Sequence, residues 1–520
     1  MPNFISYNYD QNIMLDINFN DQLQPGTFEH AIHHIIDNHL DLSIYYPRFK
    51  NDTTGRPAYD PAILLKIILF AYSKGITSSR EIEWCCKTNI IFKALSCDMV
   101  PHYTTIAEFV SGRYEEMLAL FEQVLLICHE QGLLGNELFA IDGCKMPSNA
   151  AKEWSGTFKE LEEKRAKLKR QIHHHINEHK RLDQIESHEE KYTERREQTI
   201  ETLNKACDKI DQFLKSSSPK MGQGKYPKEV KSNITDNESA KMTTSKGTIQ
   251  GYNGVAAVDR KHQVVVDAEA FGEGQEQHTL LPVVEKIKER YQRLGISEDI
   301  YAEGTIVTAD TGFASENNMK YLHENEIDGY IPDNQFRSRD PKFANQKEKY
   351  GKRHQNRKSG PTIIPASEFR LDPVNKTCIC PAGFTTWLKK EGKDKLGHHK
   401  LFFEGRISKC RVCDLKTRCM KNPDSTNSGH GHGRQVSFIL KNKRAPNYTD
   451  WMKHRVDSQE GKQIYGHRMS VVEPVFANIG TNKGLNRFSL RGKAKVNGQW
   501  QLFCIVHNLG KIAKYGNIAA

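Results

Sequence analysis

Two aspartates, Asp142 and Asp310, stand where metal-binding carboxylates are expected. Each follows a short apolar run, 138–141 for the first and 305–309 for the second, and each precedes a glycine within two residues. An apolar run of this length predicts a buried strand that leads into a loop. A side chain at the end of such a strand can point out of the sheet edge, and the glycine lets another molecule approach closely. The alternative for each is an ordinary aspartate that caps or solvates a turn.

Two carboxylates at one sheet edge suit the cleavage of a phosphodiester bond by water. That reaction needs an activated nucleophile and a stabilised leaving oxygen, and two divalent cations about 3.5–4 Å apart supply both. Mg²⁺ takes oxygen ligands and keeps several of its waters, so that a few carboxylates are enough to bind it. Asp142 and Asp310 are therefore candidate ligands of two Mg²⁺ or Mn²⁺ ions.

The elements around the aspartates predict an α/β fold, a mixed sheet with flanking helices. Once two insertions are removed, the order is strand, strand, strand, helix, strand, helix, strand, helix. A sheet of this kind collects strand ends at one edge, where functional sites gather. The predicted strands are at 138–141, 249–258, 263–270, 305–309 and 330–331, and the last helices run from about 459 through Glu473 and over 495–512.

The first 135 residues predict an all-α amino-terminal domain. Asp60 can cap a helix that has Pro61 at its first position. Thr105 and Glu108 have the spacing of a capping box, and they predict the start of a long helix that ends at Gly132. Short helices joined by tight turns suit a helix-turn-helix arrangement that enters the major groove of DNA. A plain helical bundle is the alternative.

Two segments interrupt the predicted sheet. Charged residues with sparse apolar positions at helical spacing predict a helical hairpin over 153–216, and a stretch rich in Ser, Lys, Gly and Pro predicts a mobile loop over 215–246. The second segment is polar, basic and cysteine-bearing. The predicted domains are a helical DNA-binding domain at 1–135, a catalytic core at 136–152, 247–332 and 456–520, a hairpin insertion with its loop at 153–246, and a basic cysteine-bearing insertion at 333–455.

The charge of the chain is compatible with a polyanionic partner. Lys and Arg number 75 against 64 Asp and Glu, which gives a net charge of +11. An ordinary basic protein has a similar balance. Two basic runs, 342–357 and 487–495, suit contacts with phosphates, and a solvated face is the alternative for each.

The sequence predicts neither a membrane span nor a signal peptide. No run of 18 apolar residues occurs, and the first residues lack a basic start followed by an apolar run. We therefore expect the twelve cysteines to lie in a reducing compartment, where disulfides are rare.

Several motifs resemble those of one enzyme family. The stretch 465–476 reads YGHRMSVVEPVF, and downstream of it stand Asn486-Arg487-Phe488, Arg491-Gly492 and Asn508-Leu509. This series closely resembles the carboxy-terminal signature of the DDE transposases of bacterial insertion sequences. Upstream motifs agree and occur in the family's order across most of the chain: GRPAYDP at 55–61 and TTIAEF at 104–109 resemble its amino-terminal helical domain, and AIDG at 140–143, GYN at 251–253 and ADTG at 309–312 resemble its first two catalytic motifs.

The resemblance implies a ribonuclease-H-like catalytic core in which Asp142, Asp310 and Glu473 are the metal ligands. It further implies cleavage of DNA at inverted-repeat ends and attack of the freed 3′-hydroxyl on target DNA. The implied partners are double-stranded DNA and a second copy of the chain, in the cytoplasm of a bacterium at its nucleoid. Two alternatives stay open: a DNA-binding regulator of the same architecture without catalysis, and a metal nuclease that cuts but never rejoins.

The resemblance also implies residues that hold the transposon end near the cut. Tyr465 and Arg468 match the family's motif, and Lys483 is the nearest lysine to a position where many relatives carry one. Arg487 and Arg491 belong to the same signature and to the second basic run. At 100° per residue, Arg468 and Glu473 lie about 140° apart on a regular helix, so they do not share a face. A solvated helix surface is the alternative for these residues.

Five cysteines in the second insertion could include a zinc site. Cys410 and Cys413 have a common zinc-knuckle spacing, whereas the single residue between Cys378 and Cys380 is less usual. Thiolates suit Zn²⁺ in a tetrahedral structural site. These four are the candidate Zn²⁺ ligands, Cys419 is a fifth candidate for four places, and reduced, partly buried thiols are the alternative.

Overall fold

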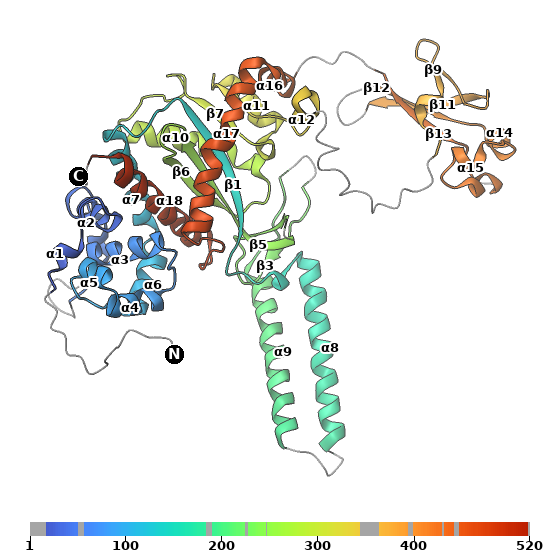
Figure 1. Cartoon of the computed structure of the whole chain (residues 1–520). Helices are drawn as coiled ribbons and strands as arrows, with labels where there is room; N and C mark the ends of the chain where they lie inside the picture. Colours follow the sequence, from blue (N-terminus) through green and yellow to red (C-terminus); the bar gives the residue numbers. More distant parts are fainter. Residues whose placement is uncertain are drawn as a thin grey trace, which may run out of the picture. The chain divides into compact units, whose positions relative to one another are not determined.

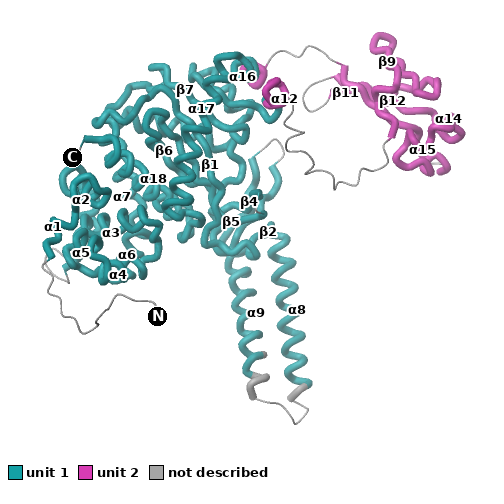
Figure 2. Tube along the Cα trace, viewed as in Figure 1, with its two compact units in different colours: residues 1–336, 452–520 teal, residues 337–451 magenta. Residues whose placement is uncertain are grey.

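The computed structural model describes residues 17–49, 57–183, 190–223, 227–245, 247–343, 363–393, 399–428, 431–440 and 447–517. The chain divides into two compact units, Met1–Phe336 together with Met452–Ala520, and Arg337–Trp451 (Figure 2). The predicted basic run 342–357 lies outside the described residues from 344 onward.

A mixed sheet lies at the centre of the first unit (Figure 1). Its six strands are β1 (Leu138–Pro147), β4 (Ala240–Thr244), β5 (Gly247–Asp259), β6 (Val265–Phe271), β7 (Ile306–Ala309) and β8 (Gly329–Tyr330). β5 pairs antiparallel with β1, β4 and β6, and β7 pairs parallel with both β1 and β8. This topology, with helices around the sheet, confirms the predicted α/β class and the ribonuclease-H-like mixed sheet.

β1 is longer than the sequence predicted. We expected the strand to end at 141, but its pairing with β5 continues from Asp142 opposite Ala256 to Pro147 opposite Gly251. The prediction was wrong because it followed the apolar run alone, and the polar second half of β1 is held by backbone hydrogen bonds instead. Asp142 therefore lies within a strand that continues beyond its neighbour β7.

The stretch 215–246 also differs from its prediction as a mobile loop. It contains β4, which extends the sheet along β5, and Met242 of this strand is buried. It also contains β3 (Ser232–Asn233), which pairs with β2 (Ser155–Gly156) at the start of the hairpin insertion. A single buried apolar residue among polar neighbours gives no alternating pattern, so the sequence carried too little signal to predict this strand.

The last helix, α18 (Lys493–Tyr515), covers the open edge of β6. An exposed strand edge presents unpaired backbone groups, and amide side chains of α18 satisfy them. Asn508 accepts a hydrogen bond from the N–H of Val265 and donates one to its carbonyl, both at 2.8 Å. Asn497 accepts from the N–H of Ala270, and Trp500 donates to a carbonyl of β5. Side chains thus replace a further strand.

Helices α10 (Leu280–Arg293), α11 (Glu316–Glu324) and α17 (Gln459–Ala477) complete the core around the sheet. The amino-terminal region is all-helical, as predicted; its helices are α1 (Phe19–Gln22), α2 (Phe28–Asn38), α3 (Pro61–Ser73), α4 (Ser79–Thr88), α5 (Ile90–Ser96), α6 (Tyr103–Gly112) and α7 (Tyr114–Glu130). It packs on α18, for example through the rings of Tyr72 and Phe503. Helical domain and core therefore share one buried interior.

The predicted start of α3 is confirmed, whereas the long helix after Thr105 is not. Asp60 accepts a 2.8 Å hydrogen bond from Ala62, and Pro61 is the first helical residue. Thr105 instead lies inside α6, whose cap is His102, and the helix ends before α7 begins at Tyr114. Apolar spacing that runs through a break cannot reveal it, so one helix was predicted where the structure has two. The helix-turn-helix arrangement stays a prediction.

The predicted helical hairpin is confirmed (Figure 1). Its helices α8 (Phe158–Asp183) and α9 (Glu190–Ser216) pack side by side, with Arg165 paired to Asp211. Leu161, Ile210 and Phe213 form a small buried cluster near the end that joins the sheet. Two long, charged helices of this kind need only a narrow apolar seam between them.

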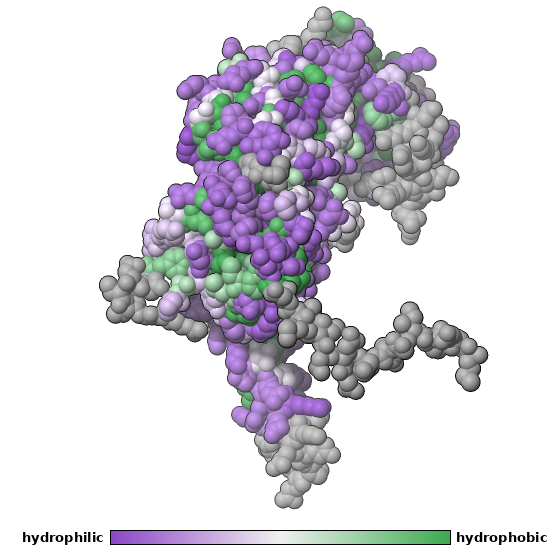
Figure 3. All heavy atoms as spheres, turned by 60° about the vertical axis from the view of Figure 1, so that its left-hand side comes forward, coloured by the Kyte–Doolittle hydropathy of each residue, from purple (hydrophilic) through white to green (hydrophobic). Residues whose placement is uncertain are grey.

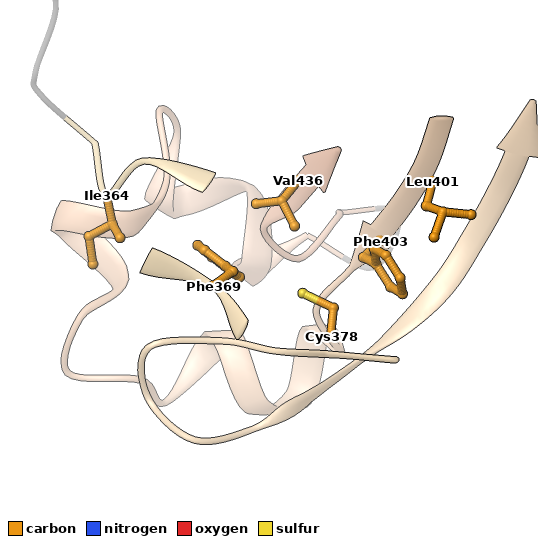
Figure 4. Close-up of a cluster of buried hydrophobic side chains, with 6 residues drawn as sticks. All are labelled: Ile364, Phe369, Cys378, Leu401, Phe403 and Val436. Atoms are coloured by element: carbon orange, nitrogen blue, oxygen red, sulfur yellow. The ribbon is translucent and has the colours of Figure 1, made fainter. Parts of the chain in front are cut away.

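The second unit has its own antiparallel sheet of five strands, in the order β13-β12-β11-β10-β9. The strands are β9 (Arg370–Asp372), β10 (Thr377–Ile379), β11 (Thr385–Lys393), β12 (His399–Glu404) and β13 (Gln435–Ile439). Two short helices, α14 (Ile407–Arg411) and α15 (Lys416–Cys419), lie between β12 and β13 in the chain. Six buried residues form its core (Figure 4). The sequence predicted only a polar insertion here.

Hydrophilic side chains cover most of the face that Figure 3 shows, with hydrophobic residues in patches between them. In the part of the chain that the structure describes, no helix combines the length and the apolar character that crossing a bilayer requires.

A buried ion pair joins α10, β6 and α7. Arg290 of α10 binds Asp267 of β6, and it also contacts Glu122 of α7 at 3.3 Å. Both Arg290 and Asp267 are buried. Such a pair is weak evidence for net stability, but removing one partner leaves the other charge buried without compensation.

We expect Arg290→Ala to lower the free energy of unfolding by roughly 3–5 kcal/mol, because it strands the carboxylate of Asp267. The matched control is Arg293→Ala, since Arg293 binds the same Glu122 but is exposed. We expect the control to cost less than about 1 kcal/mol. Urea unfolding of both variants measures the difference, and equal costs would contradict it.

Candidate active site

The pairing of β1 with β7 places Asp142 and Asp310 next to each other. Ile141 is the register partner of Ala309, so the two aspartates follow on neighbouring parallel strands. Asp310 caps the turn after β7 by accepting a 2.7 Å hydrogen bond from the N–H of Gly312. Burial raises the pKa of Asp310, and the negative charge of Asp142 raises it further. The two aspartates that the sequence singled out are thus neighbours.

Arg468 of α17 is the counter-ion of Asp142. Its Nη1 donates to Oδ2 of Asp142 across 2.8 Å, and the arginine side chain is buried. Burial by itself would lower the pKa of the guanidinium, but the charge of Asp142 and their hydrogen bond raise it above its ordinary value. Arg468 therefore carries a fixed positive charge at the aspartate pair.

A third carboxylate, Glu276, lies at the pair although the sequence analysis missed it. Glu276 opens η3 (Glu276–His278), between β6 and α10, and its Oε1 lies 3.0 Å from Nζ of Lys145 on β1. Burial raises the pKa of Glu276; Lys145 lowers it, and the charges of Asp310 and Asp142 raise it. The signal in the sequence was an acidic residue between the third strand and the next helix, a position like those of the two aspartates.

The two glycines beside the aspartates make room for the protein's own side chains. A Cβ on Gly312 would lie 2.0 Å from Oε2 of Glu276, and a Cβ on Gly143 would lie 2.7 Å from Oδ1 of Asn253. Asn253 is buried, and neither of its amide atoms has a hydrogen-bond partner among the described residues. The two glycines therefore make room for a carboxylate and an amide of the chain itself, and the approach of another molecule stays a prediction.

Glu473 lies elsewhere on α17 and is exposed. Its separation from the buried Arg468 agrees with the angle expected for a regular helix. Among the described residues, no three acidic, histidine or cysteine side chains are grouped closely enough to hold a metal ion. Asp142, Asp310 and Glu276 are close enough for the charges of the two aspartates to raise the pKa of Glu276. The role of Glu473 stays a prediction.

A hydrogen bond from outside the helix compensates for a proline near the carboxy-terminal end of α17. Pro474 has no N–H and so leaves the carbonyl of Ser470, four residues earlier, without its helical donor. The side chain of Gln263, in the turn between β5 and β6, donates to that carbonyl at 3.0 Å. A π-helical turn at Asn478–Asn482 follows directly after this helix.

The remaining residues predicted to bind DNA have different surroundings. Tyr465 is partly buried and packs against the ring of Phe336. Lys483 is only 8% exposed, and burial, together with Lys74, lowers its pKa to about 8. A phosphate therefore cannot reach Lys483 without a rearrangement.

Arg487 and Arg491 are exposed and hold the loop that follows β1. Arg487 donates to the carbonyl of Ser148 at 3.2 Å and to the side chain of Asn149 at 3.3 Å. Arg491 donates to the carbonyl of Asn149 at 2.7 Å. Both guanidinium groups keep an exposed side, so these contacts are compatible with phosphate binding, which stays a prediction.

Two family models match the chain. The model described as "Transposase DDE domain" matches residues 379–513, and the model described as "Transposase domain (DUF772)" matches residues 17–112. The chain is a DDE transposase. The first match begins inside the second unit and runs through α17 and α18, so it includes Arg468 and Glu473 but neither Asp142 nor Asp310. No curated protein and no solved structure matches the chain.

The match to the transposase models confirms the resemblance drawn from the motifs. The DUF772 match spans α1 to α6, the region in which the sequence predicted the family's helical domain. The DDE match includes most of the second unit, so the cysteine-bearing segment of this transposase lies within the family's domain.

The raised pKa of Asp310 has a measurable consequence for stability. In metal-free transposase at pH 8, we expect Asp310→Asn to melt a few degrees above the wild type, because the amide removes a charge that burial and Asp142 disfavour. A raised folded-state pKa means that the penalty is present at high pH. The advantage of the variant must therefore shrink as pH falls through that pKa, where the wild-type carboxyl becomes neutral.

Thermal melts in EDTA across pH test this expectation. Glu298→Gln is the control, because it removes an exposed carboxylate. An Asp310→Asn protein that melts below the wild type at every pH would contradict it.

Proposed function

We propose that this transposase binds the inverted-repeat ends of an insertion sequence, cleaves the DNA there with water, and joins the freed 3′-hydroxyl to target DNA. The observation that carries the proposal is the adjacency of Asp142 and Asp310, fixed by the register of two parallel strands. Family membership gives the general function, and this pair gives it a place for the chemistry. A regulator without catalysis has no need of two partly buried, mutually repelling carboxylates.

The chemistry of this cluster fits Mg²⁺ or Mn²⁺. Its donors are carboxylate oxygens, which these hard cations prefer. The carboxylates already bind positive charges of the chain itself: Arg468 binds Asp142, and Lys145 binds Glu276. Burial first, and the neighbouring carboxylates second, raise the pKa values of Asp310 and Glu276, and a bound cation would favour the charged form of both groups.

The residues then have separate tasks. Two bound ions supply an activated water and stabilise the leaving oxygen. Asp142 and Asp310, at the end of β7, would hold these ions. Arg468 holds Asp142 in one orientation and adds a positive charge near the scissile phosphate. Lys145 does the same for Glu276.

The third carboxylate has two candidates. Glu473 is the one that the resemblance implies. Because it is exposed on α17, the helix or the bound DNA has to move before Glu473 can join the two aspartates as a metal ligand. Glu276 is the one whose charge already acts on both aspartates. We propose that Glu473 completes the ligand set on DNA and that Glu276 orients Lys145 and the aspartate pair.

The amino-terminal helices bind the transposon ends in this proposal. They form the DUF772 match, and they share an interior with α18 of the core. Tyr465, Arg468, Arg487 and Arg491 then contact the end near the cut, and Lys483 joins them only after a rearrangement that exposes it. Synapsis of two ends implies a homodimer on DNA, in the bacterial cytoplasm.

We expect Asp142→Asn and Asp310→Asn each to lower strand cleavage of an inverted-repeat substrate in Mg²⁺ by roughly 1,000-fold or more. Binding of the ends in a gel shift must stay within a few fold, because the helical domain is untouched. The substrate comes from the DNA that flanks the gene. Undiminished cleavage by either variant would end the proposed ligand assignment.

The two glutamates can be compared directly. We expect Glu473→Gln to abolish cleavage as fully as the aspartate variants. Glu276→Gln should instead lower the rate by roughly 10–100-fold, because it acts through Lys145. A matched Lys145→Met variant should show the same partial loss. If Glu276→Gln is inactive and Glu473→Gln is active, the roles of the two glutamates are reversed.

A further inference from the structure

The five cysteines of the second unit have two different environments. Cys378, on β10, is fully buried, and its side chain points into the apolar cluster with Phe369, Leu401 and Phe403 (Figure 4). Cys380, only two residues later, is partly exposed and packs against the outside of that cluster. Residues two apart in a strand share a face, but β10 ends at Ile379 and Cys380 lies in the turn beyond it. The short spacing between these two cysteines therefore does not make them a pair of ligands.

The other four cysteines surround one pocket. Cys380, Cys410, Cys413 and Cys419 all line a cavity of about 30 Å³. They come from the turn after β10, from α14, from the turn after α14 and from the end of α15. The cavity has about the volume that one water molecule occupies in the liquid. Four cysteines from separate segments thus line one cavity that has room for a single small ion.

The backbone around two of these sulfurs is arranged to support thiolates. The turn after β10 is closed by a hydrogen bond from the N–H of Gly383 to the carbonyl of Cys380, and the N–H of Phe384 donates to the sulfur of Cys380 at 3.3 Å. Burial raises the pKa of the Cys410 thiol, whereas the backbone N–H of Arg434, which donates to its sulfur, acts in the opposite direction. N–H groups that point at sulfur stabilise its charged form.

Two further features fit a charged group of thiolates. The guanidinium of Arg434 lines the same cavity, and its Nε is buried without a hydrogen-bond partner among the described residues. A positive charge beside cysteines favours the thiolate. At Gly405, a Cβ would lie 2.7 Å from the sulfur of Cys410, and at Gly433 it would lie 3.2 Å away. Glycine at both positions leaves the room that this sulfur occupies.

We propose that Cys380, Cys410, Cys413 and Cys419 bind one structural Zn²⁺ ion. Zn²⁺ suits four thiolates in a tetrahedral site with Zn–S distances of about 2.3 Å, and soft ligands of this kind select it over Mg²⁺. This set differs in one member from the sequence prediction, since Cys419 replaces Cys378. The proposal is independent of the carboxylate site and of the transposition chemistry.

The ion would join α14 and α15 to the sheet of the second unit. Among the described residues of that unit, the core cluster has six buried members, and small cores commonly need a metal or disulfides as an additional constraint. The described residues hold no group of three such side chains already close enough for a metal. The sulfurs line the cavity wall, and rotation about the Cα–Cβ bond of each cysteine is the movement that would bring them together.

The metal content of the full-length transposase tests the proposal. We expect about one Zn²⁺ per chain by mass spectrometry of the metal, in protein purified under reducing conditions. Asp310→Asn must retain this zinc, so that an ion at the carboxylates is not counted. Replacement by Co²⁺ should give the thiolate charge-transfer band and the strong visible bands of a tetrahedral site.

Single variants identify the ligands. We expect Cys419→Ser and Cys380→Ser to lose at least half of the zinc and to change the Co²⁺ spectrum. Cys378→Ala is the matched control within the same unit, and Cys97→Ser is an exposed control outside it; both must keep one zinc. If Cys378→Ala does not fold, Cys97→Ser and the wild-type Co²⁺ spectrum still decide.

Several results would overturn the proposal. Reduced wild-type protein that holds no zinc would do so. Zinc that survives Cys419→Ser but is lost in Cys378→Ala would instead restore the ligand set that the sequence suggested. Disulfides among the four cysteines in freshly prepared protein would show that oxidation, and not a metal, joins these segments.

Discussion

The structure of this transposase depends on two like charges that a sheet holds side by side. The register of β1 against β7 makes Asp142 and Asp310 neighbours, because Asp142 follows Ile141 and Asp310 follows Ala309, the last pair of this ladder. Repulsion between them has to be balanced, and the chain uses long cationic side chains from other elements for this purpose. Arg468 of α17 binds Asp142. Lys145, in the polar second half of β1, binds Glu276 of η3.

Much of the remaining core serves to hold those elements in place. Near the end of α17, Pro474 leaves one carbonyl without its helical donor, and Gln263 donates a hydrogen bond to that carbonyl. α18 closes the edge of β6 with amide side chains and also carries the amino-terminal helices on its surface. The buried contacts of Arg290 tie α7 to the sheet from the other direction. The helical domain and the charged cluster are therefore parts of one folded body.

The second unit follows a different strategy. Its sheet encloses few apolar residues, and it presents four thiols around a cavity instead of a larger core. Its match to the transposase DDE model shows that such a unit belongs to the family's domain. A small sheet with little apolar burial gains more from a cross-link between its segments than a large core would.

The sequence by itself determined the elements that local patterns encode: the strands that carry Asp142 and Asp310, the cap of α3 at Asp60, the charged hairpin and the family signature around Arg468. It failed where the deciding contact lies far away in the chain. The polar half of β1 is a strand only because β5 pairs with it, and β4 follows β5 for the same reason. Glu276 joins the aspartates, and Cys378 leaves the other thiols, only after the chain has folded. Spacing along a chain reports which face of one element a residue takes, whereas charge clusters and cavities arise between elements, so only the tertiary structure decided them.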